Sequence, residues 1–208
     1  MLKIWGRATS ANVMKVLWCC DELGERYERI DWAGPFGGND DPKYRAMNPT
    51  GRVPTIEDAG NVIWESNTII RYLCDTRHGE ALYPTDPAKR SAVERWMDWQ
   101  LAHLGGAVTP LFMGYVRTPA EKRNPAALEK ARIEAIPVIQ IAEDALAHQG
   151  TQYLAGNSLT IGDIPVAIFM RRWFAFPIER PRMPKLEAWF DRVKTRPGFV
   201  AHVAVPMV

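Results

Sequence analysis

The chain has 208 residues, of which 47% are hydrophobic, and its 26 basic and 24 acidic side chains leave a formal net charge of +2. That length and apolar content suit one or two globular domains with a full core. The near-balance of charge gives no electrostatic case for binding nucleic acid or a membrane surface.

No run reaches the roughly 18 apolar residues of a membrane-spanning helix, and residues 1–5 lack the apolar centre of a signal peptide. We therefore expect a cytoplasmic protein. The three cysteines, Cys19, Cys20 and Cys74, form no Cys-x-x-Cys pair, and the four histidines are scattered. This pattern predicts neither a disulfide framework nor a metal site.

The first eighty residues alternate strand and helix signals. Residues 2–5 predict a short strand, an apolar repeat predicts a helix that stops at Gly24, and residues 27–31 predict a second strand. Two neighbouring strands joined through one helix run parallel, with a right-handed crossover. Residues 32–47 are rich in Gly, Pro, Asn and Asp, and we expect a loop there with at most one short helix.

Two short apolar runs, residues 55–57 and 62–64, flank an Asp-Ala-Gly-Asn turn and predict an antiparallel hairpin. Ser66 suits the N-cap of a helix that follows at once. The complete order is βαβ followed by ββα, which is the thioredoxin-like layout. We therefore assign residues 1–80 to one α/β domain.

Residues 81–86 have the composition of a turn-rich linker, after which strand signals stop. Apolar residues then recur every three or four positions, and further helices are predicted to begin at Thr160 and Pro184. Residues 87–208 should form an all-α helical-bundle domain. Thr160 and Asp163 fit a structural cap, in which the two side chains satisfy backbone amides at the beginning of a helix.

A candidate pocket surrounds Val53 and Pro54. If the bond before Pro54 is cis, Val53 is held outward, where its backbone N–H and C=O can pair with a peptide-like ligand. The spacing alone does not establish a cis bond, because only about 5–6% of X-Pro bonds in folded proteins are cis. The nearby helix beginning at Ser66 offers backbone N–H groups to a carboxylate, so the sequence predicts an anion-and-peptide pocket.

Along its whole length the chain resembles the cytosolic glutathione transferases. The resemblance depends on Asn48-Pro49-x-Gly51-x-Val53-Pro54, on Glu65-Ser66 eleven residues after that proline, and on Thr160-x-x-Asp163. The resemblance points to a bacterial member of the family that uses a catalytic serine and is similar to the theta or phi class. The resemblance implies a cis-proline, glutathione bound in the first domain, an electrophile bound against the second, a two-fold dimer and no metal.

The resemblance also assigns the glutathione-binding residues by position. Val53, beside Pro54, would pair its backbone with the cysteinyl unit, while Glu65 and Ser66 would hold the γ-glutamyl amine and carboxylate. Arg52 stands where related enzymes often place a basic side chain near the glycine carboxylate. From the residues alone, Ser66 could be only a helix cap and Glu65 only a solvated charge.

The catalytic group has to keep the thiol of glutathione ionised at neutral pH. A free thiol titrates near about 8.5, and one hydrogen bond from a hydroxyl at a helix start can depress its pKa by about two units. Ser10, in the loop after the first strand, is the first candidate, with Thr9 and Asn12 as runners-up; Ser10 could also be an N-cap. No cysteine occupies residues 9–13, which disfavours mixed-disulfide chemistry.

For the electrophile we expect an apolar wall from the long helix and the helix after Thr160. The candidate side chains are Leu104, Phe112, Tyr115, Trp173 and Phe174, each of which could instead be core. The predicted function is conjugation of glutathione to small hydrophobic electrophiles by a cytoplasmic homodimer. The alternatives are glutathione-dependent reduction of peroxides or disulfides on the same site, and a non-catalytic binding module of the same fold.

Overall fold

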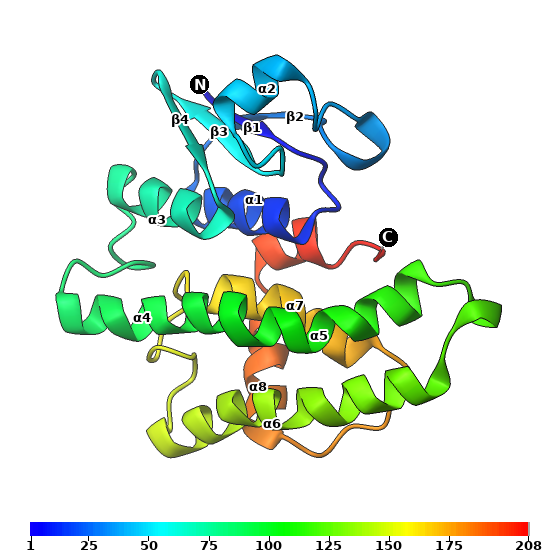
Figure 1. Ribbon diagram of the computed structural model, residues 1–208. Coiled ribbons are helices and arrows are strands. Elements are labelled where there is room, and N and C mark those ends of the chain that lie inside the picture. Colours follow the sequence, from blue (N-terminus) through cyan, green and yellow to red (C-terminus); the bar gives the residue numbers. More distant parts are fainter. Residues whose placement is uncertain (208) are drawn as a thin grey trace. The chain divides into compact units, whose positions relative to one another are not determined.

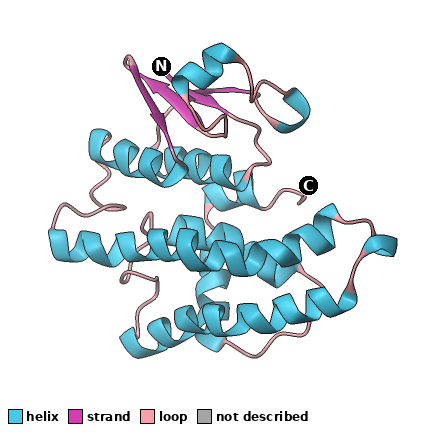
Figure 2. Cartoon of the chain, viewed as in Figure 1, coloured by secondary structure: helices cyan, strands magenta, loops and turns pink. Residues whose placement is uncertain are grey.

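The computed structural model describes residues 1–207, which divide into two compact units. Met1–Tyr83 and Pro197–Val205 make the first unit, and Pro84–Arg196 make the body of the second. All named strands belong to the first unit, and helices fill the second (Figure 2). The predicted fold class, a thioredoxin-like α/β domain followed by an all-α domain, is confirmed.

A four-stranded mixed sheet forms the centre of the first unit. Its strands are β1 (Leu2–Trp5), β2 (Tyr27–Ile30), β3 (Thr55–Asp58) and β4 (Asn61–Trp64), in the spatial order β2-β1-β3-β4. β1 pairs parallel with β2 and antiparallel with β3, which pairs antiparallel with β4. The parallel pair needs a crossover connection, and helix α1 (Ala11–Leu23) supplies it.

Helices cover both faces of this sheet. α1 packs against α3 (Ser66–Thr76) on one face, and α2 (Pro42–Met47) lies on the other (Figure 1). α1 ends at Gly24, as predicted, with the left-handed backbone (φ 65°) that favours glycine. α2 and a 3₁₀ turn at Gly34–Phe36 occupy the segment expected to be mostly loop.

The beginning of α3 differs from the prediction by one residue. Glu65 holds the N-cap position with φ 71° and makes no side-chain hydrogen bond to the helix, whereas Ser66 is the first helical residue. The expectation of an N-cap at Ser66 is therefore wrong. The left-handed backbone at Glu65 turns the chain directly from β4 into α3, which leaves no room for a separate capping residue.

The last described segment returns to the first unit. A π-helical turn, Phe199–Val203, packs against α1, where the ring of Phe199 meets that of Trp18 edge-on with 5.5 Å between centroids. His202 Nε2 lies 2.9 Å from Asp21 Oδ2. Sequence analysis did not foresee this packing, because contacts between residues 181 positions apart leave no local pattern.

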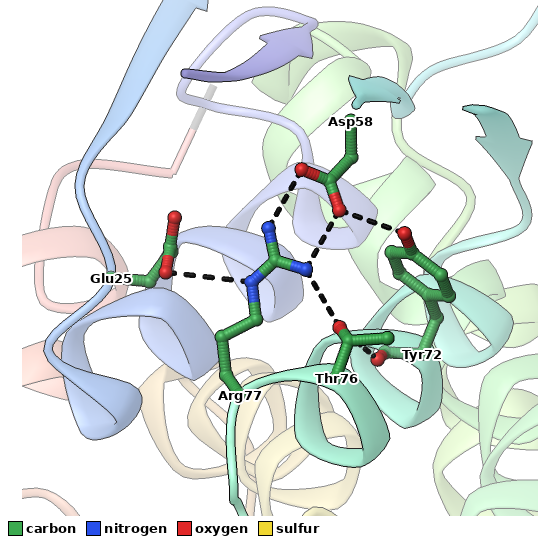
Figure 3. A network of polar contacts seen from close by, with 5 residues as sticks. All are labelled: Glu25, Asp58, Tyr72, Thr76 and Arg77. Carbon is green, nitrogen blue, oxygen red and sulfur yellow. Dashed lines mark hydrogen bonds and ion pairs between the residues drawn. The ribbon is translucent and has the colours of Figure 1, made fainter. Parts of the chain in front are cut away.

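A polar network joins the end of β3 to the end of α3 (Figure 3). Arg77, the residue after α3, donates to both carboxylate oxygens of Asp58 at 2.7 Å each, and also to Thr76 Oγ1 at 2.7 Å. Its Nε lies 3.4 Å from Glu25 Oε2, and the Tyr72 hydroxyl donates to Asp58 from 2.8 Å. The hydrogen bonds from Arg77 hold the pKa of the Asp58 carboxyl below its ordinary value.

Replacing Arg77 by methionine is expected to lower the free energy of unfolding at neutral pH by about 2–4 kcal/mol, because buried Asp58 loses its bidentate partner. A carboxyl with a depressed folded pKa contributes stability above its ordinary pKa, and this contribution is lost as the pH falls. Urea unfolding should therefore show the difference between wild type and variant shrinking as the pH falls from about 5 to about 2.

The control for this prediction is Lys130→Met, which removes an exposed ion pair with Glu134. Exposed pairs contribute little to stability, so this variant should resemble wild type at every pH. A difference for Arg77→Met that stays constant down to the lowest pH would contradict the assigned role of Asp58.

The second unit is a helical bundle built around one long, continuous helix. α4 (Pro87–Trp99) passes through a π-helical stretch, Gln100–Leu104, into α5 (Gly105–Phe112) and a further π-helical stretch, Met113–Arg117. α6 (Pro125–Gln149), α7 (Asp163–Ala175) and α8 (Pro184–Val193) complete the bundle. Within residues 1–207, no helix is long and apolar enough to span a membrane.

A buried carboxylate ties the beginning of α7 to its neighbours. Asp163 Oδ2 accepts hydrogen bonds from the Thr160 N–H at 2.9 Å and the Thr160 hydroxyl at 3.0 Å. Its Oδ1 accepts from the Leu154 N–H at 3.0 Å and the Trp189 indole at 2.9 Å. Burial raises the pKa of the Asp163 carboxyl, while these hydrogen bonds act in the opposite direction. α7 begins at Asp163 itself, three residues later than predicted, so the carboxylate reaches back to the preceding turn.

Candidate functional site

Buried polar side chains hold the loop around Val53 in one conformation. Asn48 donates to the Arg52 carbonyl at 2.9 Å and to Thr55 Oγ1 at 3.0 Å, and its own side-chain oxygen accepts from the N–H two residues further on. Tyr44 of α2 donates to the same Arg52 carbonyl at 2.7 Å. The sequence showed Asn48 only as part of a motif. Nothing in it pointed to Tyr44, whose role depends on α2 folding over the loop.

The Val53-Pro54 peptide bond is cis. Val53 is partly buried just before β3, and no group among residues 1–207 hydrogen-bonds to its backbone N–H or C=O. Backbone groups withdrawn from water are nearly always paired. The backbone at Val53 is therefore open to a ligand that binds as a short added strand.

A pocket of about 120 Å³ opens beside Val53. Its lining comes from α1, the loop before β3, and the beginning of α3: Asn12, Asn48, Thr50, Arg52, Val53, Pro54, Glu65 and Ser66. All five residues that the resemblance assigned to glutathione binding are in this lining, as is Asn12, one of the three catalytic candidates. The structure thus brings together residues separated by up to 54 positions in the sequence.

The charges around this pocket suit a zwitterion. Ser66 begins α3, where free backbone N–H groups and the helix dipole favour a carboxylate. Behind it, fully buried Lys15 donates to Asn67 Oδ1 at 3.2 Å. Arg52 and Glu65 are both exposed at the rim and carry opposite charges. A peptide with carboxylates and one ammonium group fits this arrangement.

The loop between β1 and α1 carries the three catalytic candidates. Ser10 stands at the N-cap of α1, yet its hydroxyl makes no capping hydrogen bond. That hydroxyl is therefore available to a ligand. Asn12 Oδ1 accepts from Ser66 Oγ at 3.4 Å, and Thr9 is exposed. Ser10 itself is outside the pocket lining, two residues before Asn12.

Gly6 brings this loop against the binding edge. Its φ is 151°, and a β-carbon at this position would lie 2.5 Å from Val13 Cγ2 and 3.1 Å from Val53 Cβ. Glycine adopts such a backbone without steric cost and leaves room for both neighbours. The chain that leads to the catalytic candidates therefore starts close to Val53, with no room for a side chain between them.

The five side chains predicted for the electrophile wall have different surroundings in the second unit. Leu104 and Trp173 are buried in its core, with 0% and 1% of their surface exposed. Phe174 and Tyr115 each pack against another aromatic ring, at centroid distances of 4.7 and 5.6 Å. Phe112 lies at the edge of the core. Core packing accounts for Leu104 and Trp173, and the wall remains a prediction.

Two arginines lie over the ring of Phe112. The guanidinium carbon of Arg172 lies 4.1 Å from the centroid of this ring and 4.8 Å from that of Phe169, and the guanidinium of Arg117 lies 5.6 Å from the Phe112 centroid. Burial, together with repulsion from Arg171 and Arg117, lowers the pKa of Arg172 to about 10. Arg172 is therefore still charged at neutral pH.

The cysteines and other metal-ligating residues form no second site. Within the described chain, no group of His, Cys, Asp and Glu side chains has an arrangement that could hold a metal ion. The free thiols of Cys19 and Cys74 are buried 4.0 Å apart. The hydrogen bond between them and their burial raise the pKa of Cys19, which makes its thiol unreactive.

Comparison with known proteins agrees with this geometry. Residues 9–76 match the N-terminal domain of glutathione S-transferases, and residues 106–197 match their C-terminal domain. The chain is 35% identical to glutathione S-transferase GstB of Escherichia coli K12 over the full length of both. It is 29% identical to glutathione S-transferase 3 of Zea mays, over 98% of this chain and 93% of the relative.

Among solved structures, a theta-class glutathione S-transferase from Xanthomonas axonopodis pv. citri, with glutathione bound, has a TM-score of 0.92 to this chain. The two are 44% identical, over 100% of this chain and 99% of the other. Both domains, the order of their elements and the residues of the pocket therefore lead to one assignment. The chain belongs to the glutathione S-transferase family.

Proposed function

We propose that this glutathione transferase binds glutathione in the pocket beside Val53, ionises its thiol with the help of Ser10, and transfers it to small hydrophobic electrophiles. One observation carries the proposal: the unpaired backbone of Val53 shares a pocket with Glu65 and Ser66. Glutathione has a peptide backbone that can pair with Val53 and a charged γ-glutamyl end that can bind to Glu65 and Ser66. On the family resemblance, we also propose a cytoplasmic homodimer.

In this proposal each residue of the pocket holds one part of the tripeptide. Val53 pairs its N–H and C=O with the cysteinyl unit, next to cis-Pro54. Ser66 and the N-terminus of α3 hold the γ-glutamyl carboxylate, and Glu65 holds the ammonium group. Arg52 binds the glycine carboxylate. Fixing the peptide at several points positions the sulfur for reaction and removes most of its freedom of orientation.

The chemical step follows from a single hydroxyl donor. Ser10 donates its hydrogen to the sulfur, which favours the thiolate, and the thiol proton passes to solvent. The thiolate attacks the electrophilic carbon, a carbon–sulfur bond forms, and the leaving group departs with the bonding electron pair. Ser10 therefore stabilises a charge and is neither the nucleophile nor a base.

Binding and turnover assays test the proposal together. We expect retention on immobilised glutathione, elution by free glutathione, and conjugation of an aromatic halide faster than reduction of a hydroperoxide. Faster hydroperoxide reduction would favour the peroxidase alternative, and retention without turnover would favour a binding module. If the protein is not retained on immobilised glutathione and shows no turnover, the assignment of the pocket is overturned.

Glu65→Ala should raise the Kd for glutathione about tenfold or more, because a charged hydrogen bond to the ammonium group is lost. The melting temperature should change little, since the exposed side chain of Glu65 makes no hydrogen bond to the helix. Calorimetric titration and thermal unfolding measure the two effects. The control is Glu80→Ala, which changes an exposed residue outside the pocket lining. Equal damage to binding and stability would instead show a structural role for Glu65.

A further inference from the structure

We propose that Lys15 is a positioning residue for glutathione, which holds the first turn of α3 in the place where the γ-glutamyl end binds. The inference rests on the proposed function, because it concerns the same pocket and the same ligand. It starts from two hydrogen bonds between α1 and the beginning of α3. Ser66 Oγ donates to Asn12 Oδ1 at 3.4 Å, and Lys15 Nζ donates to Asn67 Oδ1 at 3.2 Å.

These two hydrogen bonds are neighbours. Asn12 and Lys15 are three residues apart in α1, so they lie on one side of that helix. Their partners, Ser66 and Asn67, are the first two residues of α3. Asn12 and Ser66 line the pocket, whereas Lys15 and Asn67 are outside its lining and have only 0% and 3% of their surface exposed. Lys15 therefore acts on the pocket through Asn67 and does not touch the ligand.

Lys15 is the charged exception on the buried side of α1. The other buried residues of this helix are Val13, Met14, Val16, Leu17, Trp18, Cys19 and Cys20. Lysine is rarely buried completely, and an apolar side chain would fill the same position without the desolvation penalty of an ammonium group. Packing of α1 against α3 therefore does not explain the charge, whereas a hydrogen bond that fixes the beginning of α3 does.

The turn before α3 needs such support. Glu65 has a φ of 71°, a backbone conformation that is unfavourable for residues other than glycine. Strain of this kind persists only where the surrounding structure fixes the chain. The hydrogen bonds to Ser66 and Asn67 hold the two residues that follow Glu65. When the bond from Lys15 is lost, the turn can relax, and Glu65 and the N–H groups that begin α3 leave the positions that bind the γ-glutamyl end.

Lys15→Met tests this role, because methionine keeps most of the side-chain length but has no hydrogen-bond donor. We expect the Kd for glutathione to rise about tenfold, while kcat at saturating glutathione changes less than about twofold, since Ser10 and Val53 are untouched. The comparison ligand is a glutathione analogue whose γ-glutamyl carboxylate is replaced by a carboxamide. In calorimetry, wild type should bind glutathione more tightly than this analogue, and Lys15→Met should lose most of that preference.

Two further variants separate this role from general damage to the fold. Asn67→Ser shortens the acceptor and breaks the same hydrogen bond from the other side, so it should cause the same selective loss even if Lys15→Met fails to fold. Cys19→Ala is the matched control, because Cys19 is also fully buried in α1 and its thiol donates to the Ile70 carbonyl of α3 at 3.9 Å. This control should lower the melting temperature and leave the preference for glutathione unchanged.

The two ligands also separate failure of this inference from failure of the proposed function. Equal weakening of both ligands by Lys15→Met, or a preference for glutathione as strong as that of wild type, would overturn the role of Lys15 while leaving the glutathione site intact. Equal binding of both ligands to wild type, or the same loss of preference in Cys19→Ala, would overturn it as well. If wild type binds neither ligand, the proposed function fails, and this inference fails with it.

Discussion

Ser10→Ala is expected to lower kcat/KM for an aromatic halide by about 10- to 100-fold, because one hydrogen bond to the ionised sulfur is lost. The pKa of the bound glutathione thiol should rise by about one to two units, since each unit corresponds to about 1.4 kcal/mol of preference for the charged form. Activity at low pH should therefore suffer most. Ultraviolet absorbance of the thiolate, titrated in the binary complex, measures this shift directly.

The structure explains why Ser10→Ala should lower catalytic activity without lowering the stability of the fold. The Ser10 hydroxyl makes no capping hydrogen bond to α1, although the residue holds the N-cap position. Removing it should therefore leave the melting temperature nearly unchanged, and also the Kd for glutathione when it is measured at a pH below the pKa of the bound thiol. Ser10→Thr keeps a hydroxyl and should recover much of the activity.

The neighbouring donors decide the outcome if Ser10 is not the catalytic group. An unchanged thiolate titration in Ser10→Ala, with a large shift in Thr9→Ala or Asn12→Ala, would move the role to that residue. Asn12→Ala also breaks the hydrogen bond from Ser66, so its effect on binding has to be measured separately from its effect on the thiol pKa.

Asp163→Ala should destabilise the protein by about 4–5 kcal/mol, the largest loss of stability that we expect. Three buried N–H groups, those of Leu154, Thr160 and the Trp189 side chain, lose their acceptor together. Each unsatisfied buried donor costs about 1–3 kcal/mol. For a chain of this length the melting temperature should fall by roughly 10–15 °C, as measured by calorimetry.

Two further variants test that reasoning. Trp189→Phe removes one donor and leaves the carboxylate with the others, so it should cost much less than Asp163→Ala. Asp144→Ala removes an exposed carboxylate of α6 that, among residues 1–207, accepts a hydrogen bond only from Gln140, and it should have little effect. A melting temperature for Asp163→Ala close to that of wild type would show that the three donors find other acceptors.

The same carboxylate shows how far sequence reasoning reaches. Thr160 and Asp163 were predicted to cap a helix because their spacing is local, and the bond from the Thr160 N–H to Asp163 is present. The bonds from Leu154 and Trp189 could not be predicted, because they depend on where a loop and α8 lie after folding. A local pattern identifies a capping residue but not the strength with which it joins distant segments.

The sequence by itself determined the order of strands and helices in the first unit and the all-α character of the second, while the five residues assigned to glutathione came from the family resemblance and stay a prediction. Alternation, helical periodicity and short motifs are local, and the chain carries them whether or not it is folded. Only the tertiary structure decided that the backbone of Val53 is unpaired, that Tyr44 supports its loop, and that Phe199 returns to α1. It also brought the guanidinium groups of Arg117 and Arg172 over the ring of Phe112. These features arise from contacts between residues far apart in the chain, where no local pattern records them.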